Sequence, residues 1–232
     1  MQKDNFNDSH NNSLEKHTSK QIIKVQYNNI ISNNSNSNNC IVSCLDGYCF
    51  ELSMDLVVKY KISPDSIFSA SQWENILSDQ RLINCKKIAY DFAFYKMRTK
   101  SQVIEKLKSN NFSSEEISIS LEFLTRYSLI DDLEFSKKYI HDMLLKKRIG
   151  VLSLEQKLLS KGISKENIKK AIAEVYPFDN INDLITKEIE KKMRQISHKP
   201  KNKHKQLIIN YLISKGFYWD DIKKNIDNYN NF

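Results

Sequence analysis

Residues 157–172 read KLLSKGISKENIKKAI, and the same pattern occurs twice more, as KLKSNNFSSEEISISL at residues 106–121 and YLISKGFYWDDIKKNI at residues 211–226. Each copy has a Leu, an apolar residue five positions later, an Ile after five more and an aliphatic residue after another four. The copies start 51 and 54 residues apart. A repeat of this length is typical of stacked supersecondary units.

Each copy predicts two short helices joined by a tight turn. The residue that ends the first helix is one that readily adopts the left-handed conformation: Asn111, Gly162 or Gly216. Ser113 with Glu116 forms a capping box at the next helix, and Ser164 is placed to cap its counterpart. A longer helix is expected before each pair, at residues 86–97, 132–147 and 180–197. The predicted unit therefore has three helices.

The N-terminal part has a different pattern. Residues 21–31 and 40–52 contain short runs that alternate apolar and polar residues, and Asp46-Gly47 in the second range predicts a type I′ hairpin. A run of Asn and Ser at residues 33–39 predicts a flexible loop. We therefore expect a small antiparallel sheet.

Two helices should follow this sheet. Helical spacing covers residues 54–60, and Pro64 interrupts it. Ser71 and Glu74 form a capping box that predicts a helix ending near residue 84.

The sequence therefore predicts a mainly α fold: an elongated, solenoid-like tandem array of three three-helix modules, preceded by a small antiparallel β element. The expected divisions are a disordered tail at 1–20, a β-hairpin sheet with two helices at 21–84, and modules 1, 2 and 3 at 85–130, 131–177 and 178–232.

Positive charge is concentrated in the modules. The chain carries 36 basic and 28 acidic residues, and residues 1–84 hold 7 of the basic and 9 of the acidic ones. Residues 187–205 hold eight basic and two acidic residues around Pro200, which predicts a flexible basic connection able to touch phosphate. A basic helical region favours nucleic acid or an acidic protein as a partner, although a solvated surface has the same composition.

Nothing in the sequence indicates catalysis, a cofactor or a metal. Phosphate-loop, HExxH and GxSxG motifs are absent, and the five His do not pair with a nucleophile at a recognisable spacing. The four Cys form no CxxC pair and are expected to be buried or free thiols, as is usual in the cytosol. No apolar run is long enough for a membrane span, so we expect a cytoplasmic protein.

One short string links the first module to the second and is the most specific motif of the chain. Residues 129–136 read LIDDLEFS, which resembles the (I/L)-D-D-x-x-F-(A/S) signature of the RecX family. Arg98-Thr99 upstream and the Lys-Gly pairs at 161–162 and 215–216 resemble further family strings. The matching signature positions are Asp131, Asp132, Phe135, Gly150, Gly162, Gly216 and Phe217. The family's usual Ser, Glu, Gly and Glu are replaced by Thr99, Gln102, Asn111 and Lys157.

The Asp131-Asp132 pair predicts a helix N-cap rather than a metal site, because adjacent carboxylates on a cap point in different directions.

This resemblance implies a regulator that binds RecA filaments on single-stranded DNA and modulates their activities. Inhibition of ATP hydrolysis, strand exchange and co-protease activity is the expected effect, and a monomer is the expected form. The residues expected to contact the partner are basic: Arg98, Lys137, Lys138, Lys146, Lys147, Arg148, Lys191, Lys192 and Arg194. A direct, non-specific binder of single- or double-stranded DNA is the alternative.

Overall fold

The computed structural model describes residues 19–27, 38–146 and 148–227. The chain forms two compact units, which divide between Ile88 and Ala89. Most of the predicted tail and of the predicted Asn/Ser loop lies outside the described residues.

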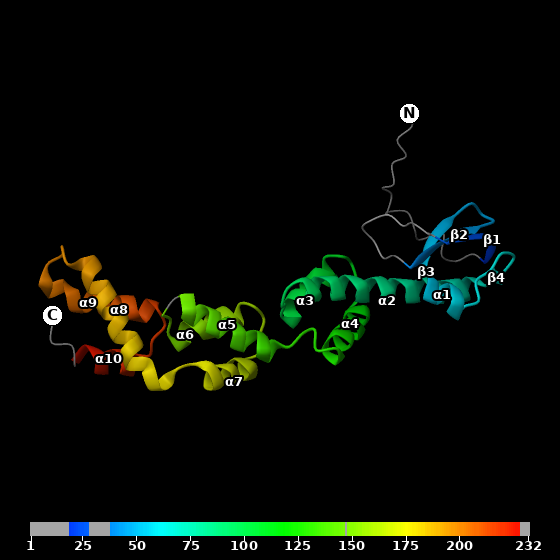
Figure 1. Ribbon diagram of the computed structural model, residues 1–232. Helices are drawn as coiled ribbons and strands as arrows, with labels where there is room; N and C mark the ends of the chain where they lie inside the picture. The colour runs from blue at the N-terminus through cyan, green and yellow to red at the C-terminus, as the bar shows by residue number, and fades with distance from the viewer. Residues whose placement is uncertain (1–18, 28–37, 147, 228–232) are drawn as a thin grey trace, which may run out of the picture. The chain divides into compact units, whose positions relative to one another are not determined.

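The N-terminal unit is a small antiparallel sheet that packs on a helix (Figure 1). Its strand order is β3-β2-β1-β4. Trp73, which is fully buried, contacts the ring of Phe50 edge-on at a centroid distance of 5.1 Å and anchors the helix to the sheet. The elements are β1 Lys20–Tyr27, β2 Asn39–Cys44, β3 Cys49–Ser53, α1 Met54–Lys59, β4 Ile67–Phe68 and the first part of α2 Ala70–Tyr95.

Several details of this unit differ from the sequence-based expectation. Lys20, which we assigned to the tail, begins β1 and is buried, and its ammonium pairs with Asp46, which compensates the cost of burying the charge. The turn between β2 and β3 is not type I′: that turn needs two residues with positive φ, and only Gly47 has one (φ 89°). The short β4, which pairs with the start of β1, was not predicted.

The predicted break near residue 84 is also wrong. α2 continues without interruption from Ala70 to Tyr95, so the predicted boundary between 84 and 85 lies inside a helix. Its capping bonds join Ser69 and Gln72, at 2.9 Å and 3.3 Å, two residues earlier than the expected Ser71 and Glu74. Gly and Pro are absent between residues 70 and 95, so no local signal ends the helix.

The C-terminal unit contains the three predicted modules (Figure 1). Module 1 comprises the end of α2 with α3 Lys100–Lys108 and α4 Ser114–Arg126. Module 2 comprises α5 Asp132–Lys146, α6 Val151–Leu159 and α7 Lys165–Val175. Module 3 comprises α8 Ile181–Ile196, α9 His204–Ser214 and α10 Trp219–Asp227, with short 3₁₀ turns at Phe178–Asn180 and Lys201–Lys203.

The repeat positions form the module cores. Leu107, Leu158 and Leu212 are each fully buried, and Phe112 and Leu121 are the half-buried members of the pattern. The turn residues Asn111, Gly162 and Gly216 all have the predicted positive φ, at 60°, 76° and 83°.

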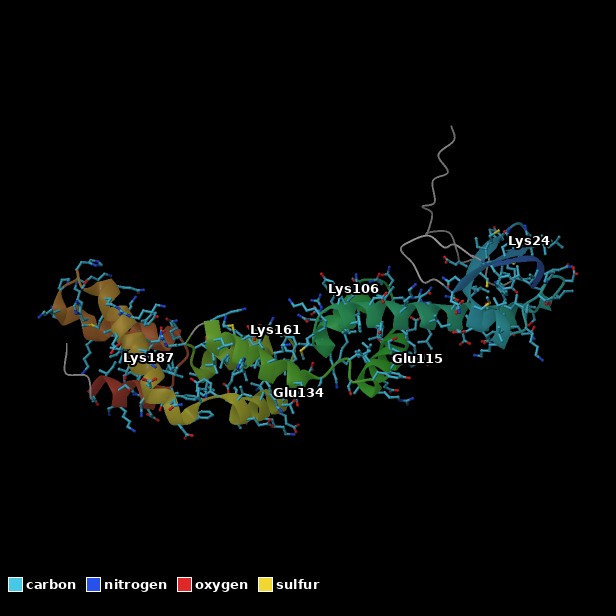
Figure 2. All side chains as sticks on the ribbon, in the orientation of Figure 1. Lys24, Lys106, Glu115, Glu134, Lys161 and Lys187 are labelled. Carbon is cyan, nitrogen blue, oxygen red and sulfur yellow. The ribbon has the colours of Figure 1, made fainter. Side chains whose placement is uncertain are left out.

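Helix ends carry complementary charge and capping bonds. The labelled Lys106 and Glu115 in Figure 2 lie in the last turn of α3 and the first turn of α4, where they complement the helix dipoles. Ser113 and Glu116 form the predicted capping box, and Ser164 accepts a hydrogen bond from the backbone of Asn167.

The basic stretch at 187–205 is not one flexible connection, as we expected. Its first ten residues belong to α8, and Lys187 pairs with Asp183 one turn earlier. Only residues 197–203 join α8 to α9, and buried His204 shares a hydrogen bond with the carbonyl of Lys199 at 2.9 Å. The helical spacing of the apolar residues at 181–196 therefore predicts the structure of this segment better than its high charge does.

Candidate functional site

The junction between modules 1 and 2 is a close backbone contact. Thr99 caps α3 and also donates its hydroxyl hydrogen to the carbonyl of Lys161, at 2.9 Å. A Cβ placed on Gly162 would lie 2.3 Å from the Cβ of Ser101. Glycine is required here both by its positive φ and by this contact.

The junction between modules 2 and 3 repeats the arrangement. The backbone N–H of Gly150 donates to the carbonyl of Lys215 at 2.9 Å, and that of Leu152 donates to Gly216 at 3.0 Å. A Cβ on Gly150 would lie 2.1 Å from the carbonyl carbon of Gly216. The glycines Gly150, Gly162 and Gly216 therefore hold neighbouring modules together, and buried Phe217 belongs to the module 3 core.

The two adjacent aspartates have different roles. Asp131 is the predicted cap of α5, because its Oδ1 accepts hydrogen bonds from the backbone of Leu133 at 2.8 Å and of Glu134 at 3.0 Å. Asp132 is buried, and its Oδ1 accepts the backbone N–H of Lys100 at 2.9 Å. Lys100 is the first residue of α3. Asp132 therefore caps a helix of the preceding module.

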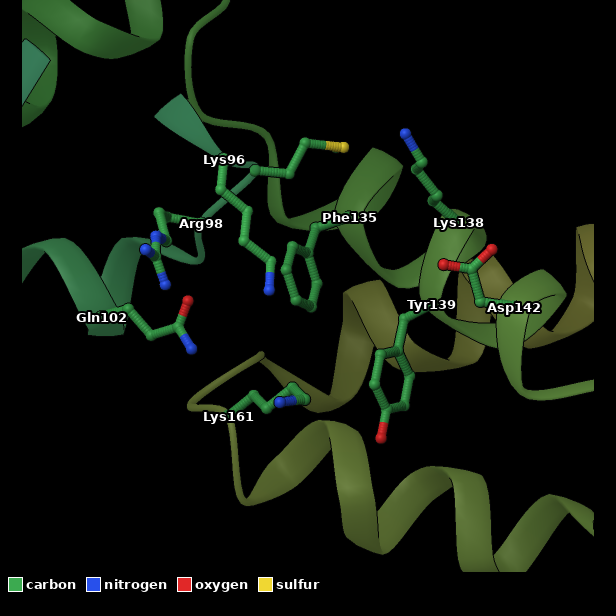
Figure 3. Close-up of a pocket in the computed structure, with 9 residues that line it drawn as sticks. Lys96, Arg98, Gln102, Phe135, Lys138, Tyr139, Asp142 and Lys161 are labelled. Atoms are coloured by element: carbon green, nitrogen blue, oxygen red, sulfur yellow. The ribbon is translucent and has the colours of Figure 1, made fainter. Parts of the chain in front are cut away.

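A hollow of about 460 Å³ lies beside the first junction (Figure 3). We call it the first junction hollow. Phe135 and Tyr139 of α5 project into it with their rings nearly parallel, at 10° and a centroid distance of 6.2 Å. Burial raises the pKa of Tyr139 above its ordinary value, so this hydroxyl stays neutral. The lining residues are Lys96, Met97, Arg98, Gln102, Phe135, Lys138, Tyr139, Asp142 and Lys161.

Two cations of this hollow, Lys161 and Arg98, lie over aromatic rings. The Lys161 ammonium lies 5.2 Å from the centroid of the Tyr139 ring. The Arg98 guanidinium lies 4.2 Å from the centroid of Phe92, and its buried Nε has no hydrogen-bond partner among the described residues.

A second junction hollow of about 480 Å³ lies between modules 2 and 3. One of its lining residues is Glu188, whose side chain is 1% exposed and pairs with Arg148 at 3.4 Å and Lys215 at 3.2 Å. Burial raises the pKa of Glu188, but hydrogen bonds from Tyr211 and Lys215 outweigh burial and hold the pKa below its ordinary value of 4.5. The lining residues are Leu144, Leu145, Lys146, Arg148, Glu188, Lys191 and Lys215.

The predicted contact residues have three kinds of environment. Lys137 pairs with Glu134 at 2.9 Å and Glu174 at 2.6 Å, and its pKa is raised by these bonds. Lys192 lies over the Tyr211 ring at 4.8 Å. Five of the residues form no ion pair with a described residue. Arg98 and Lys138 line the first junction hollow, Lys146 and Lys191 line the second, and Arg194 is exposed on α8. Lys147 lies outside the described residues.

Sequence reasoning missed several residues of these hollows. Lys161 and Lys215 did carry a signal, since both precede the turn glycine of a repeat. Lys96, Tyr139 and Glu188 carried none, because their positions depend on contacts with other modules.

The described part of the chain contains no group of three His, Cys, Asp or Glu side chains placed to hold a metal ion. None of its helices combines the length and the apolarity that crossing a bilayer demands. Burial raises the pKa of the Cys44 thiol to about 11, which keeps it protonated and weakly nucleophilic.

Comparison with known proteins gives a consistent result. The family model described as "RecX, third three-helix domain" matches residues 179–225, which cover most of α8 to α10. Regulatory protein RecX of Clostridium tetani is 31% identical over 180 residues, covering 77% of this chain and 82% of that protein. Regulatory protein RecX of Clostridium perfringens (strain 13 / Type A) is 27% identical over 177 residues, covering 75% and 82%.

Two solved structures share the fold. A crystal structure of regulatory protein RecX matches with a TM-score of 0.73 at 21% identity, covering 90% of this chain and 99% of that one. RecX from Lactobacillus salivarius matches with a TM-score of 0.59 at 24% identity, covering 63% and 95%.

Proposed function

The chain belongs to the RecX family of regulatory proteins, and from this premise we propose that it binds the RecA filament on single-stranded DNA and inhibits it. The affected activities are ATP hydrolysis, strand exchange and the co-protease function. The protein acts by occupying the filament.

The repeated junction is the observation that carries this proposal. The same contact, a Lys-Gly turn against the start of the preceding module's second helix, links module 1 to 2 and module 2 to 3. Linked copies of one unit suit a partner that is itself built of repeated subunits, because several weak contacts then add up to a high avidity.

Exposed cations near the second junction supply positive charge that can pair with acidic groups of the partner. Lys146 and Lys191 line the second junction hollow and form no ion pair with a described residue, whereas Arg148 is engaged by Glu188. Lys146 and Lys191 are therefore the better candidates for meeting acidic groups of a partner, and Arg148 has a structural role.

The test is the single-stranded-DNA-dependent ATPase of RecA with increasing amounts of this protein. We expect inhibition at concentrations well below that of RecA. Lys146→Glu combined with Lys191→Glu should raise the inhibitory concentration on the order of tenfold, because like charges then oppose the contact. Lys169→Glu with Lys223→Glu is the matched control: it makes the same charge change on exposed residues of modules 2 and 3 and should inhibit normally.

Two results would contradict the proposal. One is an unchanged ATPase rate at a molar excess of the protein. The other is inhibition that appears only when the bare DNA is saturated and disappears with added salt, which would favour the alternative of a non-specific DNA-binding protein.

A further inference from the structure

The two junction hollows occupy equivalent places in the repeat but differ in chemistry. Lys161 and Lys215 both precede the turn glycine of their modules. The Lys215 ammonium lies 3.2 Å from the buried carboxylate of Glu188, whereas the Lys161 ammonium lies over the Tyr139 ring. In the second hollow a buried carboxylate thus pairs with two of the cations, Arg148 and Lys215, whereas in the first no cation is paired with a described carboxylate.

The first junction hollow lacks a matching anion within the described residues. Lys96, Arg98, Lys138 and Lys161 line it, and none of them forms an ion pair with a described residue. Asp142 is the one carboxylate of the lining, and its side chain is exposed. The Arg98 Nε is buried without a hydrogen-bond partner in that part of the chain. Because a buried donor is costly to leave unsatisfied, this arrangement favours an anionic ligand.

The aromatic side chains narrow the class of anion. Phe135 and Tyr139 pack against the module 2 core yet remain half-buried at the hollow, so their positions are set before any ligand arrives. An acidic peptide would satisfy the cations and leave the ring surfaces uncovered. A nucleotide uses both features, since its phosphate meets the cations and its base stacks on a ring.

We infer that the first junction hollow binds single-stranded nucleic acid, with a phosphate held by Lys96, Arg98 and Lys161 and a base stacked on Phe135 or Tyr139. Lys138 contributes at the rim. Asp142 accepts a hydrogen bond from a base N–H and disfavours a second phosphate. This site goes beyond the proposed action on RecA and does not depend on it.

The experiment uses the full chain without RecA. Fluorescence anisotropy measures its affinity for a labelled oligothymidylate and for an abasic strand with the same number of phosphates. We expect the oligothymidylate to bind about tenfold more tightly, because only its bases can stack. Failure of this test would leave the RecA proposal standing, since the ATPase assay is read separately.

Substitutions of the two aromatic residues test whether the bases stack in the first junction hollow. Tyr139→Leu and Phe135→Leu should each reduce the preference for oligothymidylate over the abasic strand at least about threefold, whereas Tyr127→Leu, an exposed ring of module 1 outside the hollow, should leave it unchanged. Far-UV circular dichroism checks that the leucine variants are folded.

Exposed charges give a second readout that does not disturb the core. Lys96→Gln and Lys138→Gln remove exposed cations of the hollow, and each should lower the slope of log Kd against log salt by about 1. Lys223→Gln is the matched control and should leave the slope unchanged.

Three outcomes would overturn the inference. The first is no binding of oligothymidylate at low salt. The second is equal affinity for the oligothymidylate and the abasic strand. The third is displacement of the strand by polyglutamate with Tyr139→Leu and Phe135→Leu both neutral, which would assign the hollow to an acidic protein segment.

Discussion

Three glycines, one in the β2–β3 turn and two at the module junctions, separate two physical effects at the level of single residues. Gly47 has a φ of 89° and open space around its Cα, Gly150 has an ordinary φ of −81° but no room for a Cβ, and Gly162 combines a positive φ with a contact to Ser101. Backbone strain and steric overlap can therefore be measured separately in one chain.

We predict a graded loss of stability for alanine at these positions. Gly47→Ala should cost about 1 kcal/mol from strain alone. Gly150→Ala should cost about 3 kcal/mol or more, because the backbone of module 3 must move away from the added methyl group. Urea unfolding followed by far-UV circular dichroism measures both changes.

A double-mutant cycle tests the junction contact itself. Gly162→Ala should be less damaging in a Ser101→Gly background, because the Cβ of Ser101 that it meets at 2.3 Å is then absent. Additive effects would contradict the contact between modules 1 and 2.

Within a single helix, two consecutive basic residues can have unrelated environments. Lys137 and Lys138 of α5 differ by one position, yet Lys137 pairs with Glu134 and Glu174 while Lys138 lines the first junction hollow. Successive side chains point about 100° apart around a helix, so a basic cluster in the sequence does not remain a cluster on the surface.

Within α8, Glu188 makes stability dependent on pH. Its pKa in the folded protein is below the ordinary 4.5, so its stabilising contribution is present above that pH and is lost as the pH falls through the lowered value. At neutral pH, Glu188→Gln should cost about 2–3 kcal/mol, somewhat less than breaking a fully buried pair, because Arg148 and Lys215 retain some contact with water.

Urea unfolding at about pH 7 and about pH 3 measures this dependence. The difference between Glu188→Gln and the wild type should shrink at the lower pH. Glu190→Gln, an exposed position of the same helix, is the control and should differ little from the wild type at either pH. A difference for Glu188→Gln that does not change with pH would contradict the ion-pair explanation.

In the molecule as a whole, each of the two units has a core of its own among the described residues, and helix α2 runs from the first unit into the second. The two tryptophans report on different units: Trp73 is fully buried in the N-terminal unit, and Trp219, in module 3, is 54% exposed. Each unit can therefore be followed by its own fluorescence.

We predict two distinguishable unfolding transitions. In Trp219→Phe, the fluorescence of Trp73 should follow a urea curve that does not coincide with the loss of helical circular dichroism, most of which comes from the C-terminal unit. In Trp73→Phe, the fluorescence of Trp219 and the circular dichroism should coincide. A single shared midpoint in both variants would show that α2 couples the units into one cooperative structure.

Local patterns in the sequence predict the three-helix repeat and most of its helix ends. Three kinds of signal act within a few residues: capping pairs such as Ser113 with Glu116, the positive-φ positions and the apolar repeat. They can therefore be recognised in the sequence alone. Local patterns gave a wrong helix end at residue 84, because no nearby residue indicates that α2 continues to Tyr95.

Tertiary packing sets which charged side chains pair with one another and which remain unpaired. Thr99 meets Lys161 across 62 residues, and Arg148 meets Glu188 across 40. Such contacts depend on how the modules pack. Helical spacing places Glu188 on the face of buried Ile185 and Ile189 and Glu190 away from it, but no local pattern shows which cations Glu188 meets. Packing therefore pairs Arg148 and Lys215 of the second junction hollow with buried Glu188 and leaves the cations of the first without a described carboxylate partner, because desolvation of a side chain is a property of the assembled fold.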